Sequence, residues 1–281
     1  MPKPLVAVIT SHVVSGAVGA RAAVFALERM GFPVWSLPTV ILPWHPGRGP
    51  ATRLRLDPVA FAGAVSDLSR AADVGDVAAV LTGYFGDATQ IEPVAELIAL
   101  IKARNPQAVY LCDPVIGDAA GLFRPEEVVA GIRDRLLPLA DIATPNRYEL
   151  MWLLNTRAAD NDELAVAAAG LGPREVVVTS AFAPPGEAGL VLAEPGGVHL
   201  AVHAAVDEAP HGTGDLFAAL YLGWSLDGAA PPVALERAAA STMRLVERAV
   251  ELGVADLPLA AAQDALVAPR PGVTVARFGR V

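Results

Sequence analysis

The stretch His211-Gly212-Thr213-Gly214-Asp215, followed by the largely apolar run 216–224, organises this chain. The two glycines allow the backbone to turn tightly and to lie close to a ligand. The apolar run predicts a helix over about 215–225, and the free N–H groups and the dipole at its start favour a bound phosphate. A carboxylate would repel that phosphate, so we interpret Asp215 as a base that accepts a proton from an attacking hydroxyl. The alternative interpretation is that Asp215 only caps the helix.

The composition argues against several classes of protein. The chain has 281 residues, of which 53% are apolar, and a formal net charge of −9. This acidic balance, with no basic patch, argues against a nucleic-acid partner. No stretch reaches the ~18 apolar residues of a membrane span, and the N-terminal apolar run lacks the features of a signal peptide. Because Cys112 is the only cysteine, no intrachain disulfide can form, which fits a cytoplasmic protein.

Short apolar segments alternate with segments of helical spacing along the chain. We expect strands at Leu5–Thr10, Pro33–Leu37, Val77–Leu81, Ala108–Cys112, Asp141–Ala143 and Glu175–Ser180, a hairpin at Gly189–Leu192 and Val198–Val202, and a last strand at Val273–Ala276. We expect helices over 20–30, 57–70, 88–104, 125–137, 161–169, 215–225 and 232–252, with one more after Asn146. This alternation predicts an α/β fold with helices on both faces of a parallel sheet. Residues 11–19 are expected to form a loop, and the Pro- and Gly-rich residues 39–50 a loop or a short hairpin.

Polar side chains follow the predicted strands at their carboxyl ends, where sheets of this kind bind ligands. They are Asp113, Asp118, Thr144, Asn146, Glu149, Thr179, Ser180 and Asp215. Their oxygens suit Mg²⁺ held mainly through water and nucleotide phosphates. The alternative is that Asp113 and Glu149 cap a turn and a helix. The sequence has no Walker A motif, no dinucleotide-binding glycine pattern and no His/Cys metal cluster.

As a set, these motifs resemble a known family. Residues 212–219, Gly-Thr-Gly-Asp-Leu-Phe-Ala-Ala, are similar to the catalytic motif of ribokinase-like kinases. Five further segments resemble pyridoxal kinases in matching order: 11–14, 22–25, 81–84, 112–118 and 139–146. The resemblance implies a ribokinase-like three-layer α/β/α sandwich with a mostly parallel central sheet. It also implies one kinase domain over residues 1–281, a flap over the site at about 39–50, and a homodimer.

The resemblance further implies ATP-dependent phosphorylation of the 5′-hydroxymethyl group of pyridoxal in vitamin B6 salvage, with pyridoxine and pyridoxamine as further candidate substrates. Asp215 would be the base, and the N–H groups of the catalytic residues Gly212, Thr213, Gly214 and Asp215 would hold the γ-phosphate. The vitamer would lie against Ser11, Val18, His45, Tyr84 and Asp215. Contacts to ATP would come from Asp118, Asn146, Glu149, Thr179, Ser180 and Thr213. Mg²⁺ would lie at Asp118 and Glu149, and a monovalent cation such as K⁺ at Asp113, Thr144 and Thr179.

The flap departs from the family pattern. Residues 41–46 read Ile-Leu-Pro-Trp-His-Pro where related kinases read like Gln-Phe-Ser-Asn-His-Thr. Leu42 and Pro46 replace an aromatic and a hydroxyl that face the vitamer, Trp44 is a candidate replacement ring, and His211 stands where a small apolar residue is usual. Two alternatives therefore stay open: a hydroxymethylpyrimidine or sugar kinase of the same fold, and a non-catalytic vitamer-binding protein. A methionine beside the ring pocket would favour the pyrimidine.

Three candidate contacts also have structural alternatives when each is taken singly. Ser11 is compatible with a simple strand end, Tyr84 with a half-buried core aromatic, and His45 with a surface position.

Overall fold

A computed structural model of the chain describes residues 2–206 and 209–279. Its main strands are β1 (Leu5–Val13), β2 (Val34–Leu42), β3 (Leu54–Arg55), β4 (Val77–Thr82), β5 (Val109–Cys112), β8 (Ile142–Ala143), β9 (Glu175–Ala181), β10 (Glu187–Glu194), β11 (Gly197–Ala204) and β12 (Thr274–Arg277). They form one sheet in the order β12-β11-β10-β9-β8-β5-β4-β1-β2-β3. The six strands from β9 to β2 are parallel, and β3, β10, β11 and β12 pair antiparallel. The predicted mostly parallel sheet is confirmed.

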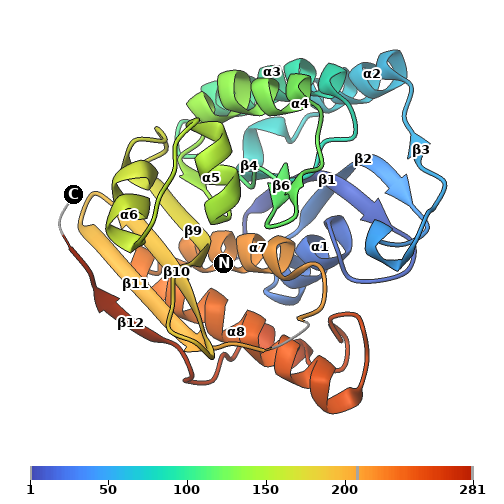
Figure 1. Cartoon of the computed structure of the whole chain (residues 1–281). Helices are drawn as coiled ribbons and strands as arrows, with labels where there is room; N and C mark the ends of the chain where they lie inside the picture. The colour runs from blue at the N-terminus through green and yellow to red at the C-terminus, as the bar shows by residue number, and fades with distance from the viewer. Residues whose placement is uncertain (1, 207–208, 280–281) are drawn as a thin grey trace.

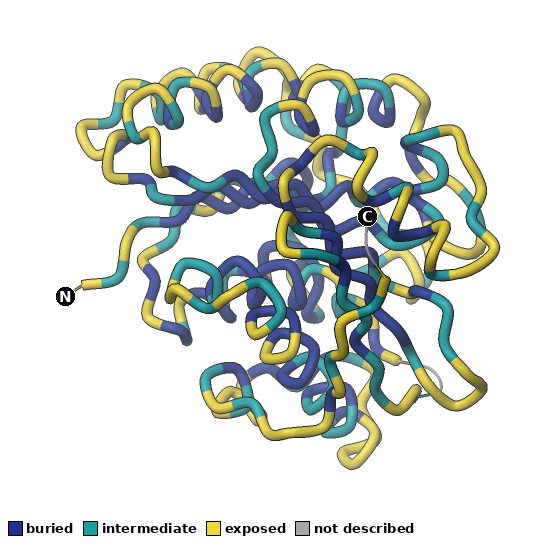
Figure 2. The backbone as a smooth tube through the Cα atoms, turned by 90° about the vertical axis from the view of Figure 1, so that its left-hand side faces the viewer, coloured by how far each residue is buried: buried dark blue, intermediate teal, exposed yellow. Residues whose placement is uncertain are grey.

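Helices cover both faces of this sheet (Figure 1). One layer contains α1 (Ala20–Arg29), α7 (Thr213–Leu226) and α8 (Pro231–Leu252), and the other contains α2 (Pro58–Ser69), α3 (Ile91–Arg104), α4 (Glu126–Gly131), α5 (Arg147–Leu153) and α6 (Asn161–Ala169). In β1, Val6 and Val8 pack with the first layer, and Ala7 and Ile9 with the second, because successive side chains of a strand point to opposite faces. Figure 2 shows the resulting buried band between two exposed outer surfaces. The predicted three-layer sandwich is confirmed.

The predicted loop over 11–19 is wrong for residues 11–13. β1 continues to Val13 because it stays paired with β2 across a shift in register, at which β2 has one extra residue between Pro38 and Ile41. The bulge therefore lies in β2, opposite Ser11. Apolar spacing within residues 5–13 does not show this pairing with β2, so the predicted strand ended too early.

The segment 39–50, predicted as the flap, begins as strand. β2 runs on to Leu42, beyond the predicted end at Leu37, and Val40 and Ile41 pair antiparallel with β3. The hairpin alternative is therefore confirmed for this segment. Its tip is a short 3₁₀ turn at Pro46–Arg48, for which the His45 side chain provides the cap by accepting a hydrogen bond from the Gly47 N–H.

Two predicted helices are segmented, and one hairpin was not predicted. The helix expected over 88–104 starts with a 3₁₀ turn at Ala88–Gln90. After α4 the chain continues as a π-turn at Ile132–Leu136 and a 3₁₀ turn around Pro138, which cannot continue an α-helix. The hairpin joins β6 (Gly117–Asp118) to β7 (Gly121–Leu122).

Within residues 2–206 and 209–279, no helix combines the length and the apolar character needed to span a membrane.

Candidate active site

The glycine-rich stretch forms the start of α7. Gly212 is the N-cap, with φ 92° and ψ 4° in the left-handed region that favours glycine. A Cβ at this position would lie 2.1 Å from the carbonyl oxygen of Ala17, so both the conformation and the available space require glycine. Asp215 lies inside the first turn, and the helix has no side-chain cap hydrogen bond. The alternative that Asp215 only caps the helix is therefore wrong.

A cavity of about 400 Å³, called the first cavity below, opens at the carboxyl ends of the parallel strands. It brings together predicted residues from seven separate segments: Ser11, Val18, His45, Tyr84, Asp113, Asp118, Thr144, Asn146, Glu149, Thr179, Gly212, Gly214 and Asp215. Its lining also contains residues that the sequence did not single out as ligand contacts: Gly19, Leu42, Pro46, Arg53, Val115, Gly117, Phe123 and His211. Leu42, Pro46 and His211 are positions at which the chain departs from the family pattern, which was the available signal for them.

A second cavity of about 280 Å³ adjoins the first, and Thr179 and Gly214 line both. The two predicted residues outside the first cavity, Ser180 and Thr213, line this second one. At the junction, no atom of the described residues lies within 4 Å of a Cβ placed on Gly214. The second cavity has an apolar wall from Leu190, Val206, Phe217, Met243 and Val246. The sequence pattern did not predict that wall.

Four carboxyl groups line the first cavity, and three of them, Asp113, Glu149 and Asp215, have raised pKa values and no basic partner among the causes. Asp113 and Glu149 are buried, at 6% and 4% exposure, while Asp215 is partly exposed. Burial, and then the charge of Asp215, raise the pKa of Asp113 to about 8. Burial, and then the charge of Asp113, also raise the pKa of Glu149. Burial raises the pKa of Asp215 to about 6, against the opposing effect of the Gly19 N–H. Within the part of the chain that the structure describes, no basic side chain contributes to these shifts, so a bound cation would stabilise the charged forms.

Glu149 and Asn146 also hold the local backbone. Asn146 Oδ1 accepts hydrogen bonds from the N–H groups of Tyr148 and Glu149, each at 3.0 Å, and Glu149 Oε2 accepts from the Asn146 N–H at 2.8 Å. Glu149 Oε1 accepts from the Ile116 N–H at 3.0 Å, and Asn146 Nδ2 donates to the Gly117 carbonyl at 2.8 Å. The alternative that Glu149 caps a helix is confirmed. The same pair joins α5 to the β6–β7 hairpin.

At the other end of the first cavity, Ser11 and Tyr84 are held by close packing. A Cβ on Gly19 would lie 2.3 Å from the Ser11 carbonyl oxygen, so this glycine permits the approach of α1 to β1. The Tyr84 hydroxyl accepts from Arg124 at 2.7 Å and from Arg53 at 3.2 Å. Tyr84 also packs against a small apolar cluster around Leu42, so it is both a half-buried packing residue and part of the cavity wall.

The predicted replacement ring does not reach this cavity. Trp44 Nε1 donates to the Gly49 carbonyl at 3.3 Å. Trp44 is not among the described residues that line the first cavity.

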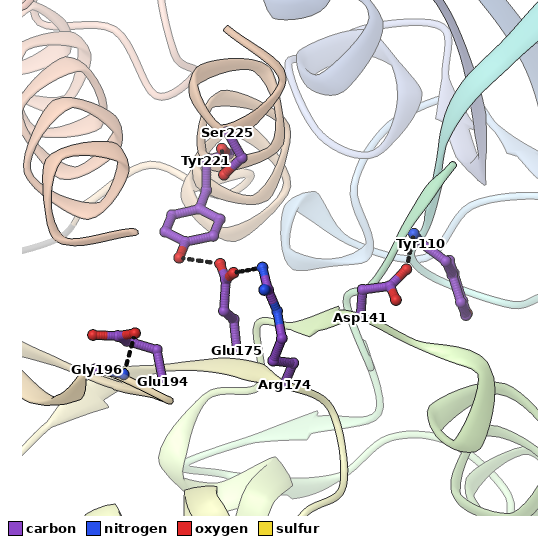
Figure 3. Close-up of polar contacts among 8 residues, drawn as sticks. All are labelled: Tyr110, Asp141, Arg174, Glu175, Glu194, Gly196, Tyr221 and Ser225. Atoms are coloured by element: carbon purple, nitrogen blue, oxygen red, sulfur yellow. Dashed lines mark hydrogen bonds and ion pairs between the residues drawn. The ribbon is translucent and has the colours of Figure 1, made fainter. Parts of the chain in front are cut away.

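A buried hydrogen bond holds α7 against the sheet (Figure 3). The Tyr221 hydroxyl donates to Glu175 Oε2 at 3.0 Å, while Arg174 donates to Glu175 Oε1 at 2.7 Å. Glu175 begins β9, the strand that carries Thr179 towards its other end. Tyr221 lies about 9 Å along the helix axis from Asp215, at 1.5 Å per residue. The bond therefore fixes the helix of Asp215 relative to the strand of Thr179.

Known proteins share this sequence pattern and fold. A family model described as phosphomethylpyrimidine kinase matches residues 57–260. Pyridoxal kinase PdxY of Rubrobacter xylanophilus is 36% identical, with 93% of each chain covered. Pyridoxal kinase PdxY of Corynebacterium diphtheriae is 34% identical, with 93% of this chain and 95% of that protein covered. The structure of pyridoxal kinase from Leishmania donovani in complex with ADP and pyridoxine has a TM-score of 0.89 and 29% identity, with 98% of this chain and 99% of that chain covered. This chain therefore belongs to the phosphomethylpyrimidine kinase family and, within it, to the pyridoxal kinases.

Proposed function

We propose that this protein transfers the γ-phosphoryl group of ATP to the 5′-hydroxymethyl group of pyridoxal, giving pyridoxal 5′-phosphate and ADP in vitamin B6 salvage. Pyridoxine and pyridoxamine are further candidate acceptors. The observation that carries the proposal is the junction of two cavities at Gly214, beside Asp215. One cavity suits the acceptor and the other the nucleotide, so the two substrates would meet at the start of α7. The Leishmania donovani relative, solved with ADP and pyridoxine, supports this pairing of ligands.

Asp215 is the proposed base. Its carboxylate takes the proton of the 5′-hydroxyl while that oxygen bonds to the γ-phosphorus, and the bond from the γ-phosphorus to the bridging oxygen of ADP breaks. Because burial raises the pKa of Asp215 only to about 6, the group is ionised at neutral pH and close to the range in which a base is most effective. The N–H groups of residues 212–215 and the helix dipole would stabilise the charge on the phosphoryl group.

The acceptor would occupy the first cavity. Ser11, buried near the end of β1 opposite the bulge of β2, would hydrogen-bond the pyridine nitrogen. Val18 and Tyr84 would pack against the ring, and His45 would approach it from the flap. These groups suit a flat, partly polar ring, because the apolar side chains can pack against its faces and the few polar atoms can orient it.

The nucleotide would occupy the second cavity. Its apolar wall, which includes Phe217, Met243 and Val246, suits a purine base. Thr179, Ser180 and Thr213 lie on the side next to the junction and would hold the phosphates. Asp118 and Asn146, which line the first cavity, would face the phosphate end of the nucleotide.

The acidic part of the first cavity fits cations that arrive with the nucleotide. Among the described residues, no group of three or more His, Cys, Asp or Glu could hold a metal ion alone, so water and phosphate oxygens would complete the coordination. Mg²⁺ would be held at Asp118 and Glu149, and bound there it would neutralise phosphate charge. A monovalent cation such as K⁺ would lie at Asp113, Thr144 and Thr179. The raised pKa of Asp113, which has no basic partner among its causes, supports a cation at that position.

We also propose that residues 1–281 form one kinase domain that works as a homodimer in the cytoplasm. The dimer is what the resemblance of the sequence motifs to pyridoxal kinases implies, and the buried Cys112 fits a reducing compartment. Light scattering on the purified protein measures the mass in solution and tests the dimer.

A second candidate is a hydroxymethylpyrimidine kinase, which the description of the matching family model favours. Against it, no methionine is found among the described residues that line the first cavity. The deciding experiment is ADP release with Mg²⁺–ATP and pyridoxal, run beside pyridoxine, pyridoxamine and hydroxymethylpyrimidine. We expect the highest turnover on pyridoxal. Turnover confined to the pyrimidine would replace the proposal, and ATP binding without ADP release on any acceptor would indicate a non-catalytic binding protein.

A further inference from the structure

The flap contacts the residue next to the phosphate-binding turn. The rings of His45 and His211 have centroids 3.9 Å apart and planes inclined by 30°. His45 lies in the flap, where it caps the turn at Pro46–Arg48. His211 directly precedes Gly212, the N-cap of α7. This tilted ring pair therefore joins the wall of the first cavity to the start of α7.

Gly47, which has no side chain, leaves space for the His211 ring. A Cβ on Gly47 would lie 2.6 Å from His211 Nε2 and 3.0 Å from His45 Nδ1. Gly47 does not have a positive φ, so its backbone conformation is open to other residues. The need for glycine here comes from the nearby rings, and chiefly from that of His211.

A second contact lies beside the first. Arg48, also in the flap, forms an ion pair with Asp256 and donates to the Ser15 hydroxyl at 3.3 Å. The backbones of Asp256 and His211 form a parallel β-bridge. His211 and Asp256 are thus neighbours in the protein body, and each of them contacts the flap. We call these two contacts, His45 with His211 and Arg48 with Asp256, the flap clasp.

The charges in the clasp favour a neutral His45. Burial, then the neighbouring His211, then Arg48 lower the pKa of His45. His45 Nδ1 accepts the Gly47 N–H at 3.1 Å, so the proton of the neutral ring is on Nε2. Asp256 provides the negative charge opposite Arg48. A neutral ring stacks on His211 without repulsion, which lets the flap lie close to the body.

We propose that His211 and Asp256 are positioning residues that hold the flap, and with it His45, over the first cavity and so set the affinity for the acceptor. In the resembling family a small apolar residue is usual where this chain has His211, and the flap sequence is altered as well. The clasp thus gives a role to one of these departures, His211, whose ring contacts the flap at His45. The kinetic part of this inference rests on the proposed pyridoxal kinase activity.

The first test is a double-mutant cycle on His45→Ala and His211→Ala, with pyridoxal and ATP varied separately. An aromatic pair corresponds to a factor of about 2 to 12 in affinity, so we expect His211→Ala to raise KM for pyridoxal by about that factor. His45→Ala should raise it by at least as much, because this variant also loses the side chain that lines the first cavity. We expect kcat and KM for ATP to stay within about twofold, and the double variant to resemble the weaker single one. A fall in kcat with a rise in KM for ATP would overturn the proposal, because it would mean that His211 only supports the turn at Gly212.

The second test measures the flap without catalysis. Trypsin can cleave after Arg48, Arg53 and Arg55 in this segment, so cleavage of the Arg53–Leu54 bond is followed separately by the mass of its products. The rate of that cleavage in unliganded protein reports how often the flap leaves the body. We expect Gly47→Ala, His211→Ala, Arg48→Ala and Asp256→Asn to accelerate this cleavage about 2- to 5-fold or more. Arg55→Ala, an exposed arginine of β3, is the matched control and should leave the rate unchanged.

The two tests separate the clasp from the proposed reaction. Equal cleavage rates in wild type and all clasp variants would overturn the clasp. Faster cleavage with an unchanged KM for pyridoxal would overturn its role in affinity. If the wild type turns over no vitamer but the clasp variants are still cleaved faster, the kinase activity is refuted and the flap contacts remain supported.

Discussion

Asp113 is buried as a carboxyl group without a basic partner, so replacing it with asparagine should stabilise the unliganded protein at neutral and alkaline pH. The substitution keeps the shape of the side chain and the oxygen that accepts the Thr144 hydroxyl at 3.1 Å. It removes only the group whose pKa burial raises from 3.8 to about 8. The protein would therefore lose an ionisable site that opposes folding.

The sign and size follow from proton linkage. Between pH 4 and pH 8 the folded state binds a proton at Asp113 that the unfolded chain has released, so the free energy of unfolding of the wild type falls as pH rises through this window. One pKa unit corresponds to about 1.4 kcal/mol, so the cost at pH 7 is on the order of 4 kcal/mol. At 6% exposure the group is little screened by solvent. Asp113→Asn has no such cost, and below about pH 4 the two proteins should have similar stability.

The assay is urea unfolding of wild type and Asp113→Asn at several pH values from 4 to 8.5, without ATP or added K⁺. The matched control is Asp118→Asn, which lies in the same cavity but is exposed and keeps an oxygen to accept the Ala120 N–H. We expect the control to change stability by less than about 0.5 kcal/mol at every pH. A stability difference for Asp113→Asn that does not grow with pH would refute the reasoning. If K⁺ binds at Asp113, adding it should stabilise the wild type and narrow the difference.

Three further predictions concern α7. Asp215→Asn should lower the rate of ADP release by a factor of about 10² to 10⁴ and leave the affinity for ATP unchanged. The rate of the wild type should fall below about pH 6, because Asp215 takes up a proton there. A variant whose residual rate falls in the same way at acidic pH would contradict this role. Gly214→Ala should fold normally, because its Cβ would enter open space, yet raise KM for ATP at least about tenfold in steady-state assays, since that space is the junction. Tyr221→Phe leaves Glu175 with Arg174 alone and should lower the free energy of unfolding by about 1–3 kcal/mol in urea, whereas an unchanged value would show that the bond contributes little.

The sequence allowed the first cavity to be predicted because its residues obey a rule of position. Asp113 and Thr144 each follow a buried strand, and Thr179 lies near the carboxyl end of β9. Parallel strands bring their carboxyl ends to one edge of the sheet. Continuous apolar runs identify such strands. Polar residues far apart along the chain could therefore be assigned to one site from the sequence alone. β1 is three residues longer than predicted, but this did not move that edge.

The second cavity could not be predicted in the same way. Phe217 and Met243 belong to helices whose apolar faces pack against the sheet. An apolar side chain follows the same helical spacing whether it meets a neighbour or an empty space, so the pattern contains no sign of a cavity. The bond between Tyr221 and Glu175 was equally hidden, because the register of α7 against β9 depends on how whole layers pack.

The flap clasp is the clearest example of a feature that local sequence patterns cannot predict. Gly212 has a positive φ, and that requirement follows from its own backbone within the Gly-Thr-Gly-Asp motif. Gly47 has no such requirement, and in a segment rich in proline and glycine it resembles an ordinary loop residue. Its glycine is needed because His211, more than 160 positions later in the chain, fills the space that a Cβ would take. A glycine that is needed for its backbone conformation can be recognised from its own sequence motif. A glycine that is needed for space depends on a residue far away in the sequence, and only the folded structure shows which residue that is.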